Sequence, residues 1–535
     1  WDDHDRSNKF TALAVAKNYL DSCAPNAIIF TLGDNDTFPL WYAQEVEGYR
    51  TDVRVCNLSL LNTSWYIDQM KRQAYNSAPL PISMDWDTYK DGSREQIIFA
   101  QGNGQFVDLK TVMNYIKQSQ FNDKRLLMFL PDGYRTDGQA IPGSFSIPVD
   151  KNKVIANGTV ALKDTAQIVD RITWNLKNDG QVCNVLKAYL VMMDILAHNN
   201  WERPIYFAST TGPEGWFGLE NYFQLEGIAY RLVPISTPNE YPSLGRIDTD
   251  ILYDNLMNKF GDHSRTDKVN NPKATASTAY PYLWGGLNDP RVYNNEDNNR
   301  LFSNISLMHT RLAKSLIAKG DYKKAENVLD RVTMIFDPQV TPTIQVCNIP
   351  FSLQNIEVAK LYLSLRTPSA TEKGIKLASY ILDDLKESFA WLEKCDDNTL
   401  QIQSENINYF VMFFSEIVEN LTPEQLKTLQ PKINEIKTQN ISKKLISQLS
   451  REAASTIKKF YSAEGDEFGP LQRETYRVLS GMAYWEKIFS VQNNTQQLES
   501  IKAEIDKQFA ALGGVDPRLR TSIEYAIYPE RERRD

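Results

Sequence analysis

The strongest constraint on the fold is a strand–helix–strand pattern near the start of the chain. Residues 27–32, AIIFTL, form a short continuous apolar run, which is typical of a strand buried on both faces. A helix is predicted over 39–48, with a proline in its first turn and a glycine just past its end. A second strand is predicted over 52–61. Because a strand, a crossover helix and a second strand form a βαβ unit, the two strands are expected to be parallel.

The same alternation of strand and helix signals continues to about residue 235. Further helices are predicted over residues 10–23, 62–75 and 184–199. Further strands are predicted over residues 95–100, 125–131, 203–209 and 227–234. The turn-rich segment 131–153 is expected to leave the sheet. The first domain, residues 1–235, is therefore predicted to be α/β with a mostly parallel sheet.

The pattern changes twice after residue 235. Residues 236–300 are rich in Pro, Asn, Gly and Tyr, with one predicted helix at 249–260, and are expected to form an irregular connector packed on both neighbours. Residues 301–535 have helical spacing almost throughout, which predicts an all-α array. Within it, residues 307–338 resemble one tetratricopeptide helix–turn–helix unit, whose packing positions are taken by Leu312, Ala313, Gly320, Tyr322, Ala325 and Leu329.

Composition narrows the classes of function. The chain of 535 residues has a formal net charge of -8 and no long basic run, so nucleic acid and anionic membrane surfaces are unlikely ligands. Its five cysteines include no CxxC pair, so the sequence suggests neither a zinc knuckle nor a thioredoxin-like site. Its four histidines include no HExxH motif, which argues against a zinc hydrolase. Neither GxSxG nor a phosphate-binding glycine loop occurs. The richest apolar run, residues 189–197, is interrupted by Asp194 and falls short of the ~18 residues that span a bilayer.

The polar stretch Asp34, Asn35, Asp36 and Thr37 directly follows the first predicted strand, where α/β folds bind ligands. Asp34 and Asp36 could ligate a hard cation, so Ca²⁺ or Mg²⁺ is the candidate cofactor, and the same groups could bind sugar hydroxyls. The positive end of the following helix opposes a cation but favours carboxylates. In the alternative, Asp36 or Thr37 caps that helix and Asp34 stabilises the loop.

Two other sets of residues are candidates for binding. The first residues of the chain include Asp2, Asp3, His4 and Asp5, which could contribute to a metal site or bind a sugar, or form a solvated chain start. The aromatic residues Trp65, Tyr66, Trp216 and Phe217 could stack on sugars, or lie in the core or an interface.

Three segments resemble the C-terminal soluble part of a family of large multi-pass membrane proteins that is common in Bacteroidota and was long of unknown function. The segments are WDDHDRS at the start, residues 26–70, and RPIYFA followed by EGIAYRLVP. The family's membrane half is similar to the lipid-sugar-dependent glycosyltransferases of the GT-C type, including protein O-mannosyltransferases. A related eukaryotic membrane protein is an O-mannosyltransferase with a tetratricopeptide-like C-terminal region.

The resemblance implies that the parent transfers a sugar from a polyprenyl-phosphate donor to an acceptor, a protein hydroxyl, on the periplasmic face of the inner membrane. This chain would be its periplasmic part, with Trp1 close to the last membrane helix and the N-terminal membrane domain as its partner. The family's catalytic aspartate matches no position here. The segment DTA, residues 164–166, also resembles a short O-glycosylation motif, with Thr165 as the acceptor.

Three functions therefore remain open. The chain could bind or position the acceptor, with the helical array presenting a surface to acceptor or envelope proteins. It could instead be a non-catalytic envelope interaction scaffold. A free-standing hydrolase that uses Asp34 and Asp36 is a third reading. Apolar segments of about 20 residues upstream of Trp1 would support the first.

Overall fold

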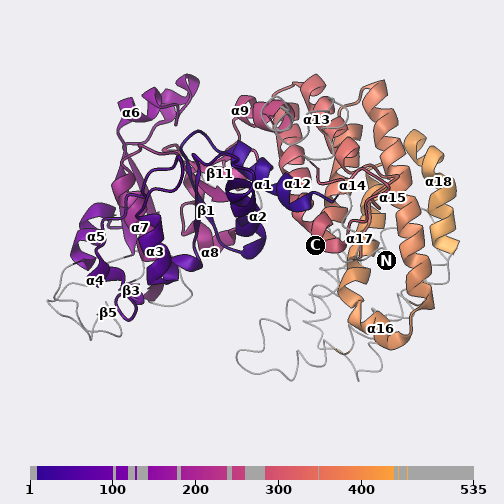
Figure 1. Cartoon of the computed structure of the whole chain (residues 1–535). Coiled ribbons are helices and arrows are strands. Elements are labelled where there is room, and N and C mark those ends of the chain that lie inside the picture. Colours follow the sequence, from indigo (N-terminus) through magenta and orange to yellow (C-terminus); the bar gives the residue numbers. More distant parts are fainter. Residues whose placement is uncertain are drawn as a thin grey trace, which may run out of the picture. The chain divides into compact units, whose positions relative to one another are not determined.

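The computed structural model describes residues 9–100, 104–117, 127–128, 143–176, 182–237, 244–259, 284–346 and 349–438, together with 444 and 455. The chain divides into two compact units, with the boundary between Asn294 and Asn295 (Figure 1). In the described residues, the first unit contains helices and three sheets and the second contains helices. The predicted fold class, α/β followed by all-α, is confirmed. The first eight residues, most of 118–142 and almost all of 439–535 lie outside the described residues.

The largest sheet has five strands in the order β10-β11-β9-β1-β2. Their bounds are Phe223–Glu226 for β10, Ala229–Leu232 for β11, Ile205–Ala208 for β9, Ile28–Thr31 for β1 and Arg54–Asn57 for β2. The three strands β9, β1 and β2 are parallel, as predicted, whereas β11 is antiparallel to both of its neighbours, β9 and β10. All of their residues are buried, in agreement with the apolar runs at β1 and β9, although β2, β10 and β11 also bury polar or charged residues.

Helices connect the parallel strands. Helix α2 (Asp34–Glu45) joins β1 to β2 and packs on α1 (Thr11–Ser22), while α7 (Lys187–Asn199) precedes β9. The predicted start of α2 at Pro39 is wrong, because the polar residues before it already belong to the helix and Pro39 lies inside it. Almost every residue of α7 is buried, including Asp194. No described helix is both long and apolar enough to cross a membrane.

Two smaller sheets complete the first unit. One has the order β5-β3-β8, with bounds Leu127–Met128, Gln96–Ala100 and Val182–Leu186; the other has the order β4-β6-β7, with bounds Val107–Asp108, Ser144–Pro148 and Arg171–Asn175. Strand β6 falls in the segment that was expected to leave the sheet, and it pairs within this separate sheet. The described residues of this unit also form helices α3 (Ser64–Met70), α4 (Trp86–Tyr89), α5 (Leu109–Ile116), α6 (Lys151–Ala156), α8 (Gly212–Trp216) and α9 (Thr249–Tyr253), the last of which continues as a π-helix over Asp254–Lys259. Short 3₁₀ helices cover Leu60–Asn62, Leu162–Gln167 and Glu220–Tyr222.

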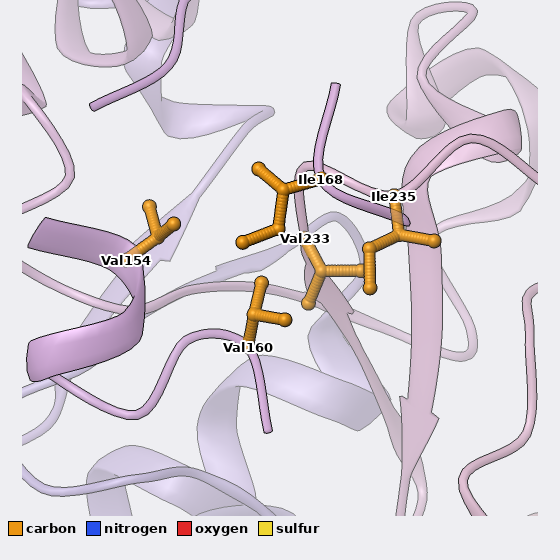
Figure 2. Close-up of a cluster of buried hydrophobic side chains, with 5 residues drawn as sticks. All are labelled: Val154, Val160, Ile168, Val233 and Ile235. Carbon is orange, nitrogen blue, oxygen red and sulfur yellow. The ribbon is translucent and has the colours of Figure 1, made fainter. Parts of the chain in front are cut away.

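In a small apolar cluster, α6 and the segment that follows it pack against the residues at the end of β11. Figure 2 shows its five buried side chains, Val154, Val160, Ile168, Val233 and Ile235. The backbone follows the same arrangement, since the amide of Val169 donates to the carbonyl of Pro234. Segments about 70 residues apart in sequence therefore share one core.

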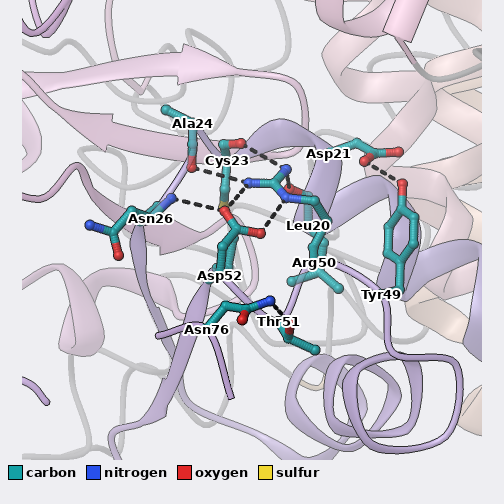
Figure 3. A network of polar contacts seen from close by, with 12 residues as sticks. Leu20, Asp21, Cys23, Ala24, Asn26, Tyr49, Arg50, Thr51, Asp52 and Asn76 are labelled. Carbon is teal, nitrogen blue, oxygen red and sulfur yellow. Dashed lines mark hydrogen bonds and ion pairs between the residues drawn. The ribbon is translucent and has the colours of Figure 1, made fainter. Parts of the chain in front are cut away.

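A polar network lies at the start of β1 and β2 (Figure 3). The guanidinium of Arg50 donates to the carbonyl oxygens of Leu20 at 2.7 Å and Cys23 at 3.1 Å, and it pairs with Asp52 at 2.8 Å. Asp52 also accepts the amide of Asn26 at 2.9 Å. A cation at these carbonyls stabilises the C-terminal end of α1, so this network positions the helix against the sheet.

As far as residue 438, the described part of the second unit is made of packed helices. Their bounds are Glu296–Ala318 for α12, Tyr322–Ile335 for α13, Ile349–Ser364 for α14, Pro368–Lys394 for α15, Asp397–Ile402 for α16, Ser404–Glu419 for α17 and Pro423–Thr438 for α18. The first two form a hairpin in which Gly320 adopts a φ of +79° at the turn and Asp321 caps α13. Leu312, Ala313, Ala325 and Leu329 are buried between neighbouring helices, as a helix–turn–helix repeat requires, whereas Tyr322 is exposed.

Candidate functional site

The carboxyl ends of β1, β2 and β9 meet at one edge of the large sheet, which is the edge where α/β folds bind ligands. Three loops follow these strands: residues 32–33 after β1, 58–63 after β2, and 209–211 after β9. The predicted site residues Asp34 to Thr37 form the first turn of α2 at this edge. The structure divides the four residues into two buried and two exposed side chains.

Thr37 is fully buried and links the first two loops. Its hydroxyl donates to the carbonyl of Gly33 at 2.7 Å and accepts a hydrogen bond from the side-chain amide of Asn57 at 2.8 Å. The oxygen of that same Asn57 side chain accepts the amide of Leu60 at 2.8 Å. Thr37 therefore shapes the edge and does not face a ligand.

Asp36 links the β1 loop to the β9 loop. Its side chain is only 3% exposed, and Oδ2 accepts the hydroxyl of Thr210 at 2.7 Å and the amide of Leu32 at 3.3 Å. Burial raises the pKa of this carboxyl, and the hydrogen bonds act in the opposite direction. Tyr19 extends the connection, with its hydroxyl 3.1 Å from that of Ser209, and burial raises its pKa to about 12.

Asp34 and Asn35 are exposed, and neither side chain has a hydrogen-bond partner within the described part of the chain. The N-cap of α2 is Gly33, so the expected capping by Asp36 or Thr37 is wrong. Carboxylates in this first turn suit the helix dipole, which opposes a cation. The described residues include no group of three or more His, Cys, Asp or Glu side chains placed to hold a metal ion. Of the four residues from Asp34 to Thr37, Asp34 and Asn35 are thus the two that a ligand could reach.

A row of aromatic rings starts one turn further along α2. The ring of Phe38 lies 5.5 Å from that of Trp41, which lies 6.4 Å from Tyr66 on α3, and Tyr66 lies 5.5 Å from Trp65. Phe38 is 51% exposed and Trp65 is 57% exposed, whereas Tyr66 is buried and accepts the amide of Asn57 at 3.0 Å. We call these four residues the aromatic row.

Sequence reasoning named half of this row. It singled out Trp65 and Tyr66 but missed Phe38 and Trp41, although their spacing of four and seven residues from Asp34 places them on one helix face. The other two aromatic candidates are partly buried: Phe217 stacks on Tyr189 at 5.3 Å, and Trp216 packs edge-on to Tyr230. They contribute to packing within the unit.

The remaining predicted residues lie elsewhere. Asp2, Asp3, His4 and Asp5 fall outside the described residues. Thr165 is half-buried in the 3₁₀ helix Leu162–Gln167, where its hydroxyl donates to the carbonyl of Leu162 at 3.2 Å. Its neighbour Asp164 is buried and paired with Arg246 at 2.9 Å. Glycosylation of Thr165 stays a prediction.

The division between buried and exposed aspartates gives a direct stability test. Asp36→Ala leaves the hydroxyl of Thr210 and the amide of Leu32 without their acceptor, so we expect the free energy of unfolding to fall by about 1–3 kcal/mol. Asp34→Ala, two residues away in the same turn, is the matched control and is expected to change it by less than about 0.5 kcal/mol. Urea unfolding measures both, and equal effects would contradict the assigned difference in burial.

Comparison with known proteins gives one match. No curated protein and no solved structure matches the chain. Residues 12–251, which run from α1 into α9 and contain all three sheets, match the family model of TMEM260-associated domain 2. This region of the chain, including the edge with Asp34 and the aromatic row, is therefore similar to a domain that is named for its association with the membrane protein TMEM260.

Proposed function

We propose that this chain is the periplasmic accessory region of a membrane-bound, lipid-sugar-dependent glycosyltransferase, and that it binds or positions the acceptor. The observation that carries the proposal is the match of residues 12–251 to TMEM260-associated domain 2, which ties this region to a membrane protein. The resemblance of its N-terminal segments to the soluble part of GT-C-like proteins supplies the chemistry: a sugar moves from a polyprenyl phosphate to a protein hydroxyl.

The geometry of the loop edge supports positioning over hydrolysis. Paired-carboxylate hydrolysis requires two carboxyl groups that both face the substrate. Here Asp36 is buried and accepts hydrogen bonds from Thr210 and Leu32, while Asp34 is exposed. The buried partner fixes the loops, and the exposed one offers a hydrogen-bond acceptor next to the aromatic row.

Transfer assays test the accessory role. The isolated chain, mixed with a polyprenyl-phosphate-linked sugar and envelope protein, is expected to give no glycosylated product, because the donor site belongs to the membrane half. In cells, truncating the gene just before the codon for Trp1 is expected to reduce glycosylation of envelope proteins, measured by mass spectrometry, and the intact gene should restore it. Turnover by the isolated chain, or an unchanged glycoproteome after truncation, would contradict the proposal.

An envelope scaffold is the second candidate. It is favoured by the second unit, where α12 and α13 form a hairpin with the buried small residues of a tetratricopeptide-like repeat, an architecture that presents extended binding surfaces. This function predicts that the truncation removes an envelope complex and leaves glycosylation unchanged. Native electrophoresis of solubilised envelopes beside the same mass spectrometry separates the two functions.

A further inference from the structure

The exposed side chains at the start of α2 and α3 form a surface of mixed character. Phe38 and Trp65 each expose more than half of their surface, although large aromatic side chains are normally well covered. The rings are connected through Trp41 and Tyr66, so the exposed ones are held by neighbours from two helices. Rigid, exposed rings of this kind are the anchors of binding surfaces.

The polar groups beside the rings restrict the class of ligand. Asp34 precedes Phe38 by one helical turn, and Asn35 precedes it by three residues, so both lie on the same side of α2. Both side chains are exposed and can accept hydrogen bonds from hydroxyl groups. Helix α2 has no Lys, Arg or His, so nothing on it attracts a phosphate, an acidic peptide or an anionic membrane.

We propose that the aromatic row, together with Asp34 and Asn35, binds a neutral glycan. A sugar ring has an apolar C–H face, which stacks on an aromatic ring, and an edge of hydroxyl donors, which matches the carboxylate and the amide. A purely apolar peptide would leave these polar groups without partners, at a cost in binding free energy. The proposal deepens the proposed function, on which it rests, by giving the acceptor-positioning region a site for sugar.

The site is tested by titrating the full chain with neutral gluco-, manno- and xylo-hexasaccharides and following tryptophan fluorescence and binding heat. We expect at least one of them to bind. Trp65→Ala and Phe38→Ala should each weaken that binding by about tenfold, the effect of losing one stacked ring. Asp34→Ala should weaken it by a similar factor, while circular dichroism stays unchanged.

Trp86→Ala is the matched control. Trp86 is 54% exposed and contacts one ring, that of Tyr89 at 5.6 Å, but it lies on α4 outside the aromatic row. Its loss should leave the affinity for the hexasaccharide unchanged. Three results would each overturn the proposal. The first is that no hexasaccharide binds at concentrations up to about 10 mM. The others are that Trp86→Ala loses as much affinity as the variants of the aromatic row, and that the chain prefers an apolar peptide of similar length.

The outcome is separable from that of the proposed function. Glycan binding is measured on the chain alone, without a membrane half or donor. If the chain binds a glycan and the variants lose that binding, but truncation leaves envelope glycosylation unchanged, the site stands and the proposed function fails. If truncation changes the glycoproteome but the chain binds no glycan, the proposed function stands and the glycan site fails.

Discussion

Asp194→Ala is expected to lower the free energy of unfolding of the first unit by about 3–5 kcal/mol, because it leaves buried polar groups without their partner. Asp194 is fully buried in α7. Its carboxylate accepts the amides of Ser83 at 2.6 Å and Met84 at 3.0 Å and the hydroxyl of Ser83 at 2.7 Å. His198 lies 3.0 Å away, one turn along the helix. Alanine would remove the acceptor and leave a cavity.

Two nearby variants serve as controls for Asp194. Ser83→Ala removes one hydroxyl and keeps both amide bonds, so a loss of about 1 kcal/mol is expected. Lys117→Ala removes an ammonium that donates to the same hydroxyl at 2.7 Å in an exposed hydrogen bond, and should change stability by less than about 0.5 kcal/mol. Urea unfolding of the full chain, with hydrogen exchange of residues 79–90 and 187–199, assigns the effect to this unit. Equal losses in all three variants would contradict the assigned role of Asp194.

Asp194 also shows what a local pattern can and cannot reveal. As the one charge in the apolar run 189–197, it argues against a membrane span, and the run is indeed a buried helix. His198 follows the i,i+4 spacing of a helix, but Ser83 and Met84 are 111 and 110 residues away, so no spacing rule could identify them. A buried polar residue predicts that partners exist, but it does not predict which they are.

Most of the large sheet was predictable because β1, β9 and β11 lie in largely apolar runs of the sequence. The ranges 27–32, 203–209 and 227–234 each contain the observed strand, with errors at the ends only. Strand β10 was missed, since Phe223–Glu226 includes a buried glutamine and a buried glutamate that read as surface residues. Glu226 is accommodated there because it accepts hydrogen bonds from Tyr206 at 2.6 Å and Gln224 at 2.6 Å.

The candidate site followed from sequence in its position but not in its chemistry. The rule that ligands meet the carboxyl ends of parallel strands selected Asp34 to Thr37, and these residues do lie at that edge. Which of them faces outward depends on Thr210, 174 residues from Asp36, and on Asn57, 20 residues from Thr37. The prediction places Asp34 to Thr37 in a loop and therefore starts α2 too late, at Pro39. Carboxylates are in fact favoured in the first turn of a helix, which is where these residues lie.

Acidification is expected to destabilise the second unit through His309. This side chain is fully buried in α12, where Nδ1 lies 2.7 Å from the carbonyl oxygen of Ile305 and therefore carries the proton of a neutral ring. Burial lowers its pKa to about 4, with a smaller contribution from Arg331, against an ordinary value of 6.5. The imidazole thus stays neutral in the folded chain at a pH where it is already protonated in the unfolded chain.

The sign of the effect follows from proton binding. Below pH 6.5 the unfolded chain takes up the proton first, so stability is complete above that pH and falls as the pH drops towards 4. At about 1.4 kcal/mol per pKa unit, the total loss is about 3 kcal/mol. Because carboxylates also respond to acid, the informative quantity is the difference between wild type and His309→Gln, which has no titratable side chain at this position.

We expect His309→Gln to be less stable than wild type at pH 7.5 and to approach or exceed it at pH 4.5. The measurement is urea unfolding of the full chain at both values, with hydrogen exchange of α12 to locate the change. Asp384→Asn is a useful comparison in the same unit, because burial raises the pKa of Asp384 and gives its charge the opposite pH dependence. A difference between wild type and His309→Gln that is constant from pH 7.5 to 4.5 would show that His309 takes up its proton equally in both states, and that its burial does not control acid stability.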